Sequence, residues 1–159
     1  IAVTGVQTCA LPICEDWDSQ LAWLHALPTG LPVDGEFQVT SGWGLRMDPF
    51  TGQLARHEGL DFTASDGTPI VAAADGIVTR SGWESTYGNI IEITHAEGFM
   101  TRYAHLSQRR VNEGQQIKRG QHIADVGSTG RSTGPHLHYE VFRHGRVMNP
   151  VQVLSLSRS

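Results

Sequence analysis

Two short segments of the sequence carry side chains that bind metals or move protons. In the first, His57 and Asp61 stand four positions apart. Such a pair also occurs as an ordinary surface ion pair, so it decides nothing alone. In the second, His136 and His138 are separated by one residue. Because side chains on a strand alternate between its faces, these two imidazoles either line a polar sheet surface or reach one ion together.

The other histidines are less informative, although imidazole is the commonest metal ligand and titrates near neutral pH. His105 stands at the expected end of a strand, from which it can project into a groove. The remaining four of the eight histidines have no companion at ligand spacing. We assign solvated or structural positions to His25, His95, His122 and His144.

Two histidines and one carboxylate form a donor set that suits zinc. Catalytic zinc sites take three protein ligands and leave the fourth position to a water that ionises near neutral pH. The resulting hydroxide can attack a peptide carbonyl, while further histidines move protons or hold the developing oxyanion. The spacing His-x-x-x-Asp plus His-x-His differs from the helix-borne His-Glu-x-x-His pattern of the zincins.

The composition favours one domain that turns often and makes short strands. The chain has 159 residues, enough for one hydrophobic core, with 18 glycines and 7 prolines spread along it. Its net charge of -4, without a Lys/Arg cluster, argues against a nucleic-acid binder. No apolar stretch is long enough to span a bilayer, and the N-terminal residues lack the positive start of a secretory signal.

Residues 1–14 differ in composition from the rest and resemble the translation of a sequencing-library adapter. We therefore expect this segment to be a sequence artefact. Its exclusion removes Cys9 and Cys14 from any argument about disulfides or metals. A signal peptide, a membrane anchor or an upstream domain could have been lost with the natural N-terminus, so membrane anchoring stays open.

The remaining sequence predicts an all-β domain after a short leader. Residues 15–27 carry apolar side chains at helical spacing, which predicts one short N-terminal helix ending at Pro28. The leader, helix plus linker, covers residues 15–36; the main domain is expected over 37–152 and a tail over 153–159. Within the domain, runs rich in Val, Ile, Thr, Tyr and Phe alternate with glycine-containing turns, which predicts an antiparallel sheet.

Individual strands follow from the same alternation. On the last one, Leu137, Tyr139 and Val141 alternate with the histidines and are expected to face the core. The expected strands are residues 37–41, 69–74, 76–81, 90–95, 100–105, 121–126 and 137–143, with turns at 48–52, 88–89 and 97–98.

Taken together, the motifs resemble the lysostaphin/LytM-type zinc metallopeptidases, which hydrolyse peptide bonds in peptidoglycan. The similarity extends from about residue 42 to 150. It rests on the ordered motifs at 42–46, 57–62, 67–70, 103–107 and 127–138. The resemblance implies a two-layered, sandwich-like antiparallel β-sheet with the zinc site in an open groove, whose walls include loops 48–53 and 129–135.

The family pattern also implies roles for single residues. It implies that one zinc ion (Zn²⁺) is bound by His57, Asp61 and His138. Beside the metal, it implies catalytic roles for His105 and His136, one as general base or acid and the other stabilising the tetrahedral intermediate; their assignment stays open. The implied protein is a metalloendopeptidase of the cell envelope, periplasmic or secreted. Its implied reaction is hydrolysis of peptidoglycan cross-bridges by a metal-bound water, with the bond that is cut left open.

Two alternatives remain at this stage. Some relatives lack metal ligands and act as catalytically inactive LytM-type regulators of cell-wall hydrolases, whereas all five positions are filled here. Residues 111–114 and 118–121 also resemble the glycine-punctuated hairpins of lipoyl-type carrier domains. Lys118 has no matching flank, however, and an analogy of fold does not supply a function.

Overall fold

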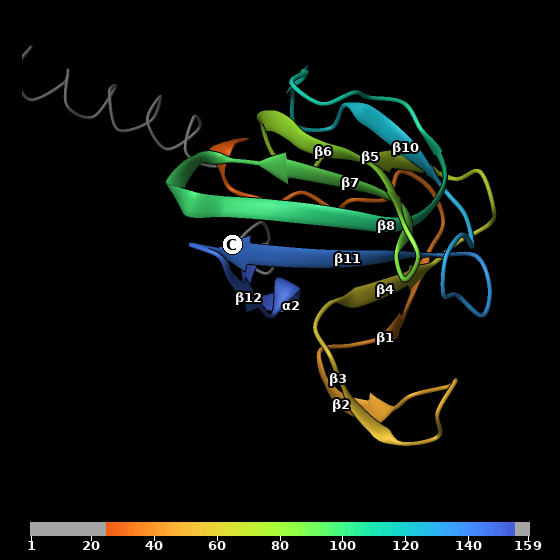
Figure 1. The fold of residues 1–159 in the computed structure, drawn as a ribbon. Coiled ribbons are helices and arrows are strands. Elements are labelled where there is room, and N and C mark those ends of the chain that lie inside the picture. Colours follow the sequence, from red (N-terminus) through yellow and green to blue (C-terminus); the bar gives the residue numbers. More distant parts are fainter. Residues whose placement is uncertain (1–24, 155–159) are drawn as a thin grey trace, which may run out of the picture.

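The computed structural model of the chain describes residues 25–154. In this part, almost all regular structure is β-strand (Figure 1). The exceptions are the helical residues His25 and Ala26, a 3-10 turn, η1 (Ala96–Gly98), and a short helix, α2 (Pro150–Leu154). The strands are β1 (Gln38–Ser41), β2 (Gly44–Met47), β3 (Leu54–His57), β4 (Leu60–Thr63), β5 (Pro69–Val71), β6 (Gly76–Glu84), β7 (Gly88–Thr94), β8 (Phe99–Arg109), β9 (Gln116–Ile117), β10 (His122–Val126), β11 (His136–Arg143) and β12 (Arg146–Met148).

Some predictions fall on residues outside this range. The predicted helix at 15–27 is covered only at its last three positions, and Cys9 and Cys14 are not covered. None of the helices in the described part of the chain is long and apolar enough to span a bilayer.

One large antiparallel sheet organises the molecule (Figure 1). Its strands follow the order β1-β4-β11-β8-β7-β6-β9, with β12 beside β11. The long strand β8 pairs with β7 and β11 along its first part and with β10 along its second part. β10 also pairs with β5, and buried side chains of both strands pack on the core face of the long strands, which makes these two strands a second layer over the core. The prediction of an all-β, antiparallel, two-layered fold is therefore confirmed.

The core lies on one face of the long strands. Tyr103 of β8 is fully buried, and its ring centroid lies 5.4 Å from that of Tyr139 on β11. Ile70 of β5 and Ile123 of β10 close the same cluster from the second layer. As the alternation predicted, the fully buried side chains of β11 are Leu137, Tyr139 and Val141.

The segment before the first strand also packs against this core. Leu27 and Val33 are buried, and Val33 forms a β-bridge with Ile70. The Gly30 N–H donates a hydrogen bond to the Ala73 carbonyl over 3.1 Å. Residues 27–33 thus contribute directly to the folded body.

Several strands were not predicted from the sequence, and three of them bring site residues into the fold. β2 and β3 form a separate two-stranded sheet around the predicted turn at 48–52. β4 carries Asp61 between Leu60 and Phe62. β2 and β3 contain no β-branched residue, and β4 contains an aspartate, a residue type that is depleted in strands. Pairing with neighbouring strands, rather than propensity, therefore determines these three elements. The short strands β9 and β12 were also missed.

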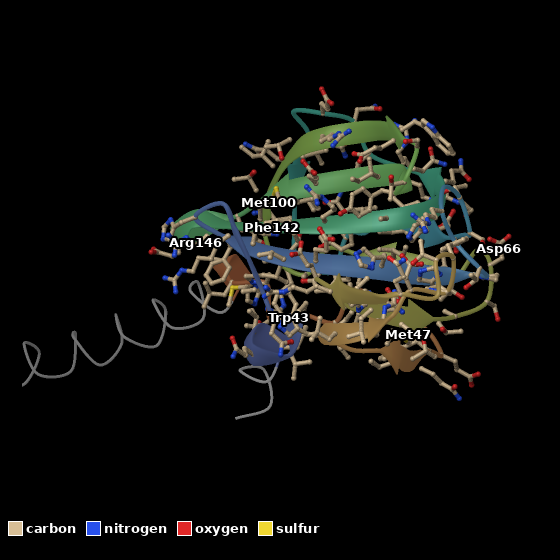
Figure 2. The ribbon with its side chains drawn as sticks, turned by 60° about the horizontal axis from the view of Figure 1, so that its bottom comes forward. Trp43, Met47, Asp66, Met100, Phe142 and Arg146 are labelled. Carbon is tan, nitrogen blue, oxygen red and sulfur yellow. The ribbon has the colours of Figure 1, made fainter. Side chains whose placement is uncertain are left out.

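The face of the long strands opposite the core changes character along its length. Met100 of β8 and Phe142 of β11 are cross-strand partners at one end of this face (Figure 2). Two residues further along each strand, Arg102 pairs with Glu140. The next residue of β11 on this face is His138, so the face leads from an apolar end to the histidines.

Candidate metal centre

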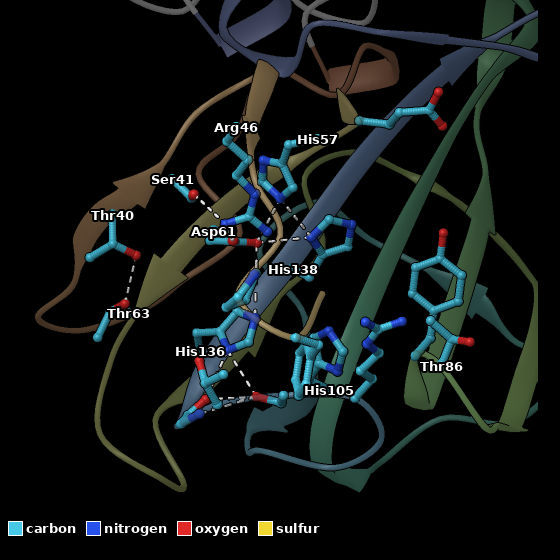
Figure 3. Close-up of a pocket in the computed structure, with 18 of the residues that line it drawn as sticks. Thr40, Ser41, Arg46, His57, Asp61, Thr63, Thr86, His105, His136 and His138 are labelled. Atoms are coloured by element: carbon cyan, nitrogen blue, oxygen red, sulfur yellow. Dashed lines mark hydrogen bonds and ion pairs between the residues drawn. The ribbon is translucent and has the colours of Figure 1, made fainter. Parts of the chain in front are cut away.

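Four strands bring all five predicted site residues to one groove (Figure 3). They are His57 at the end of β3, Asp61 in β4, His105 in β8, and His136 and His138 in β11. Pro49, Phe50 and residues 131–135 contribute to the walls of the groove. Both loops that the resemblance implied as walls therefore contribute to it.

The register of two neighbouring strands sets the centre of this groove. β4 and β11 run antiparallel, with Asp61 directly opposite His138. Gly59, in the turn between β3 and β4, lies against β11. A Cβ there would lie 2.6 Å from the Tyr139 carbonyl oxygen and 2.9 Å from His138 Cε1. Only glycine therefore allows the turn to approach closely enough to bring His57 to the same place.

Three atoms of the metal-binding type converge in this position. Asp61 Oδ1 lies 2.8 Å from His138 Nδ1 and 3.2 Å from His57 Nε2. The two ring nitrogens are 3.3 Å apart. All three residues are buried. Within the described residues, they form the cluster whose spacing suits a metal ion.

Hydrogen bonds on the far side of each ring decide which nitrogen is free. His57 Nδ1–H donates to the Gly42 carbonyl over 2.7 Å, and His138 Nε2–H donates to the Glu140 carboxylate over 2.9 Å. When both rings are neutral, each remaining nitrogen therefore presents a lone pair to Asp61. Two lone pairs and a carboxylate oxygen repel one another unless a cation or a proton lies between them. This donor set fits a zinc ion.

The electrostatics of the cluster favour a positive charge within it. Burial lowers the pKa of His138, but its hydrogen bonds with Asp61 and Glu140 outweigh burial and raise the pKa to about 9. Burial raises the pKa of Asp61, but its hydrogen bonds with the two histidines hold that pKa well below the usual range. In the absence of a metal, a proton takes the place of the cation.

His105 and His136 face the cluster from one side, with ring centroids 4.8 Å apart. His105 Nδ1–H donates to the Thr129 carbonyl over 2.7 Å, and His136 Nδ1–H donates to the Gly134 carbonyl over 2.8 Å. The free Nε2 of His136 lies 3.9 Å from Asp61 Oδ1. Burial lowers the pKa of His105 to about 4, so this ring is neutral near pH 7.

A β-bulge turns His105 into the groove. The pairing of β8 with β7 shifts register in the stretch that contains this residue. His105 has a φ of 61°, in the left-handed region that non-glycine residues seldom adopt. Tyr103 and Leu106 both remain fully buried while His105 lines the groove. The predicted strand end at His105 is therefore wrong: β8 continues to Arg109, and the bulge directs the side chain.

Two charged residues at the cluster were missed by sequence reasoning. Arg46 of β2 places Nη1 3.5 Å from Asp61 Oδ2 (Figure 3). Nothing in the sequence pointed to this contact, because the pairing of β2 with β3 was not predicted. Glu140 could have been found, because it follows His136 and His138 at the same period of two on β11. The histidines without an assigned role do not line the groove.

Comparison with known proteins shows to which family the chain belongs. The sequence pattern of peptidase family M23 matches residues 55–150. The chain belongs to peptidase family M23. Among M23 relatives, it is 47% identical over 105 residues to the peptidoglycan DD-endopeptidase ShyC of Vibrio cholerae, across 66% of this chain and 24% of ShyC.

Solved structures of M23 peptidases share the fold. A zinc-containing peptidase from Vibrio cholerae is 40% identical, with a TM-score of 0.72 over 81% of this chain and 39% of that one. The catalytic domain of the antimicrobial peptidase lysostaphin from Staphylococcus simulans is 33% identical, with a TM-score of 0.69 over 75% of this chain and 92% of that domain. The predicted resemblance to lysostaphin-type peptidases is thus confirmed.

The M23 match covers only part of the relatives. The chain spans about a quarter of the length of the curated relatives that it matches, 27% and 24% for the first two. Family membership fixes the fold and the class of protein. The individual roles of His57, Asp61, His105, His136 and His138 stay predictions.

Proposed function

We propose that this M23 chain is a zinc-dependent endopeptidase that hydrolyses peptide cross-links of bacterial peptidoglycan in the cell envelope. The observation that carries the proposal is the convergence of His57, Asp61 and His138 on one point beside a groove. ShyC is named a peptidoglycan DD-endopeptidase, which supports a bond between D-configured residues as the one that is cut.

The proposed metal ligands are His57 Nε2, Asp61 Oδ1 and His138 Nδ1. When bound, zinc supplies a Lewis acid that polarises a peptide carbonyl and lowers the pKa of water. The protein holds both imidazoles by their other nitrogens, so neither ring has to reorient. Because both rings are already oriented, the positive charge of the metal would lie where negative charge develops on the peptide carbonyl oxygen.

His105 and His136 would move the protons of the reaction. Each has its Nδ1–H committed to a backbone carbonyl, which leaves Nε2 as the reactive nitrogen. One Nε2 accepts a proton from the water that attacks the carbonyl carbon, and that proton passes to the amine nitrogen as the C–N bond breaks. The other ring, when protonated on Nε2, donates to the carbonyl oxygen as negative charge develops there.

The groove walls suit an extended anionic peptide. Arg46 lies beside the cluster, and Arg131 also lines the groove. The Arg131 guanidinium lies 4.4 Å from the ring centroid of Phe50 and 3.4 Å from Asp48 Oδ1, which holds it at the rim. Peptidoglycan peptides carry free carboxylates, and guanidinium groups bind carboxylates well.

The alternatives considered from the sequence gain no support from the site. An inactive LytM-type regulator is expected to lack ligand side chains, whereas all five residues line the groove. Lys118, the residue on which a carrier function would depend, stands in an exposed position between β9 and β10, within the segment that the M23 family matches.

Digestion of purified peptidoglycan tests the proposal. Cross-linked muropeptide dimers, followed by mass spectrometry, should be converted to monomers by zinc-loaded protein, not by chelator-treated protein, and again after zinc is restored. Asp61→Asn should lose most of this activity, because it removes the charge of the one carboxylate among the three proposed ligands. The exposed Asp66, outside the groove, offers Asp66→Asn as a matched control that retains it. A folded, zinc-loaded protein that leaves every dimer intact would contradict the proposal.

A further inference from the structure

A row of alternating charges crosses four strands and ends at His138. On β6, Arg80 faces Glu92 of β7. Glu92 faces Arg102 of β8, and Arg102 faces Glu140 of β11. The nitrogen–oxygen distances along the row are 3.8, 2.8 and 2.7 Å. The last carboxylate then contacts the imidazole of the proposed metal ligand.

Glu140 receives donors on both of its oxygens. Its Oε1 accepts from His138 Nε2 over 2.9 Å and from the Tyr87 hydroxyl over 3.0 Å. Its Oε2 accepts from Arg102 Nη1 over 2.7 Å. An ionised carboxylate can only accept, so the proton of this hydrogen bond must stand on His138 Nε2.

The hydrogen bond with Glu140 decides which ring nitrogen of His138 can bind a metal. Once a metal ion takes the place of the proton between Nδ1 and Asp61, the imidazole is neutral, and its one proton on Nε2 leaves the lone pair of Nδ1 for the ion. Nδ1 is the atom that lies 2.8 Å from Asp61 Oδ1. The opposite tautomer would place a proton inside the cluster and leave Glu140 facing a lone pair.

The burial of the Glu140 carboxylate indicates a role other than stabilising the fold. Glu140 is only 3% exposed, and its partner Arg102 is also bound to Glu92. Taking such charges out of water offsets most of their attraction, so buried ion pairs contribute little net stability. The contact of Glu140 with His138 points instead to a role at the metal site.

We propose that Glu140 is a positioning residue, which fixes the tautomer and orientation of His138 so that Nδ1 becomes the ligand. Arg102 and Tyr87 hold the carboxylate in place. The inference rests on the proposed function for the presence of zinc. Carboxylates bound to a ligand histidine raise its basicity, and their loss weakens metal binding by about 10- to 100-fold.

Zinc affinity in two matched variants tests this role. Glu140→Gln keeps the shape of the side chain and removes its charge. Glu92→Gln makes the same change on the other carboxylate bound to Arg102 and leaves His138 untouched. Metal-free proteins are titrated with zinc against a competing chelator, with thermal unfolding of the same samples as a check of folding. Glu140→Gln should bind zinc about 10- to 100-fold more weakly, and Glu92→Gln should stay close to wild type.

A second measurement needs no variant. Long-range proton–nitrogen NMR correlations of the imidazoles in zinc-loaded wild-type protein report which nitrogen carries the proton. His138 should carry it on Nε2, with the metal on Nδ1. This measurement tests the proposed tautomer of His138 even if Glu140→Gln does not fold.

Three outcomes would overturn the role of Glu140 while leaving the zinc site intact. They are wild-type zinc affinity in Glu140→Gln, an equal loss of affinity in Glu92→Gln, and a proton on His138 Nδ1 in the loaded protein. Wild-type protein that binds no zinc would instead overturn the proposed function together with this inference, so the two failures can be distinguished.

Discussion

At the scale of single residues, the two histidines of β11 differ in which ring nitrogen the protein holds. His136 is held at Nδ1 by the Gly134 carbonyl, and His138 is held at Nε2 by Glu140. The free nitrogen of His138 lies 2.8 Å from Asp61 Oδ1, whereas that of His136 lies 3.9 Å away. Two residues of one type on one face of a strand are therefore suited to different tasks.

Alanine variants of this pair should separate binding from turnover. His138→Ala should lose zinc, because one of three ligands is removed. His136→Ala should keep zinc but lose about 10²- to 10⁴-fold of its turnover, because only a proton-transfer group is removed. Zinc content by mass spectrometry and peptidoglycan turnover are measured on the same samples. His122→Ala, outside the groove, should keep both properties, and equal zinc loss in the two test variants would show that their roles are assigned wrongly.

At the scale of elements, β8 and β11 each place one tyrosine in the core, and the two hydroxyl groups differ in their hydrogen bonding. The hydroxyl of Tyr103 accepts a hydrogen bond from the Ala73 N–H over 3.0 Å and lies 3.0 Å from Thr101 Oγ1. The hydroxyl of Tyr139 has no hydrogen-bond partner among the residues that the structure describes. Both side chains are fully buried.

Removing each hydroxyl should therefore have different consequences for stability. Tyr103→Phe should lower the free energy of unfolding by about 1–3 kcal/mol, because the buried Ala73 N–H is left without its acceptor. Tyr139→Phe should be neutral or stabilising, because a buried hydroxyl without a partner is removed. Urea unfolding of the metal-free proteins measures both, and losses of similar size would refute the distinction.

A buried histidine at the end of β7 makes stability depend on pH. His95 Nδ1–H donates to the Asp75 carbonyl over 2.7 Å, and Nε2 lies 2.8 Å from Thr101 Oγ1. Burial outweighs the effect of Asp75 and lowers the pKa of His95 below its usual value of 6.5. Below that pH the unfolded chain takes up a proton that the folded protein does not bind. Folding is therefore opposed as the pH falls through this window.

His95→Gln should remove this contribution. The free energy of unfolding of the wild type should fall more steeply than that of the variant as the pH is lowered from 7 toward 5, whatever the difference between them at neutral pH. Urea unfolding across this range, with both proteins metal-free, gives the two slopes. Parallel curves would mean that His95 titrates alike in the folded and unfolded states.

The sequence predicted the elements whose side chains alternate between core and groove. β11 is the best case, because its apolar and histidine positions follow a period of two. β4 could not be predicted in this way, because Asp61 is a poor strand former and its position depends on pairing with β11. The bulge at His105 likewise depends on the neighbouring strands, whose register no local pattern encodes.

At the scale of the whole molecule, the candidate site depends on contacts between distant segments. Spacing alone suggested His57 with Asp61, and His136 with His138, as separate pairs. The β4–β11 register brings the two pairs together; from the sequence, only the family resemblance implied that they meet. The contact of Arg46 with Asp61 and the charged row behind His138 required the assembled sheets.

The central claim is that three side chains far apart in the sequence bind one zinc ion, and anomalous diffraction tests it most directly. Crystals of zinc-loaded protein would be measured on both sides of the zinc absorption edge. We predict one peak about 2.0–2.2 Å from His57 Nε2, an Asp61 carboxylate oxygen and His138 Nδ1. A folded protein that shows no such peak, or that binds its zinc through other residues, would contradict the claim.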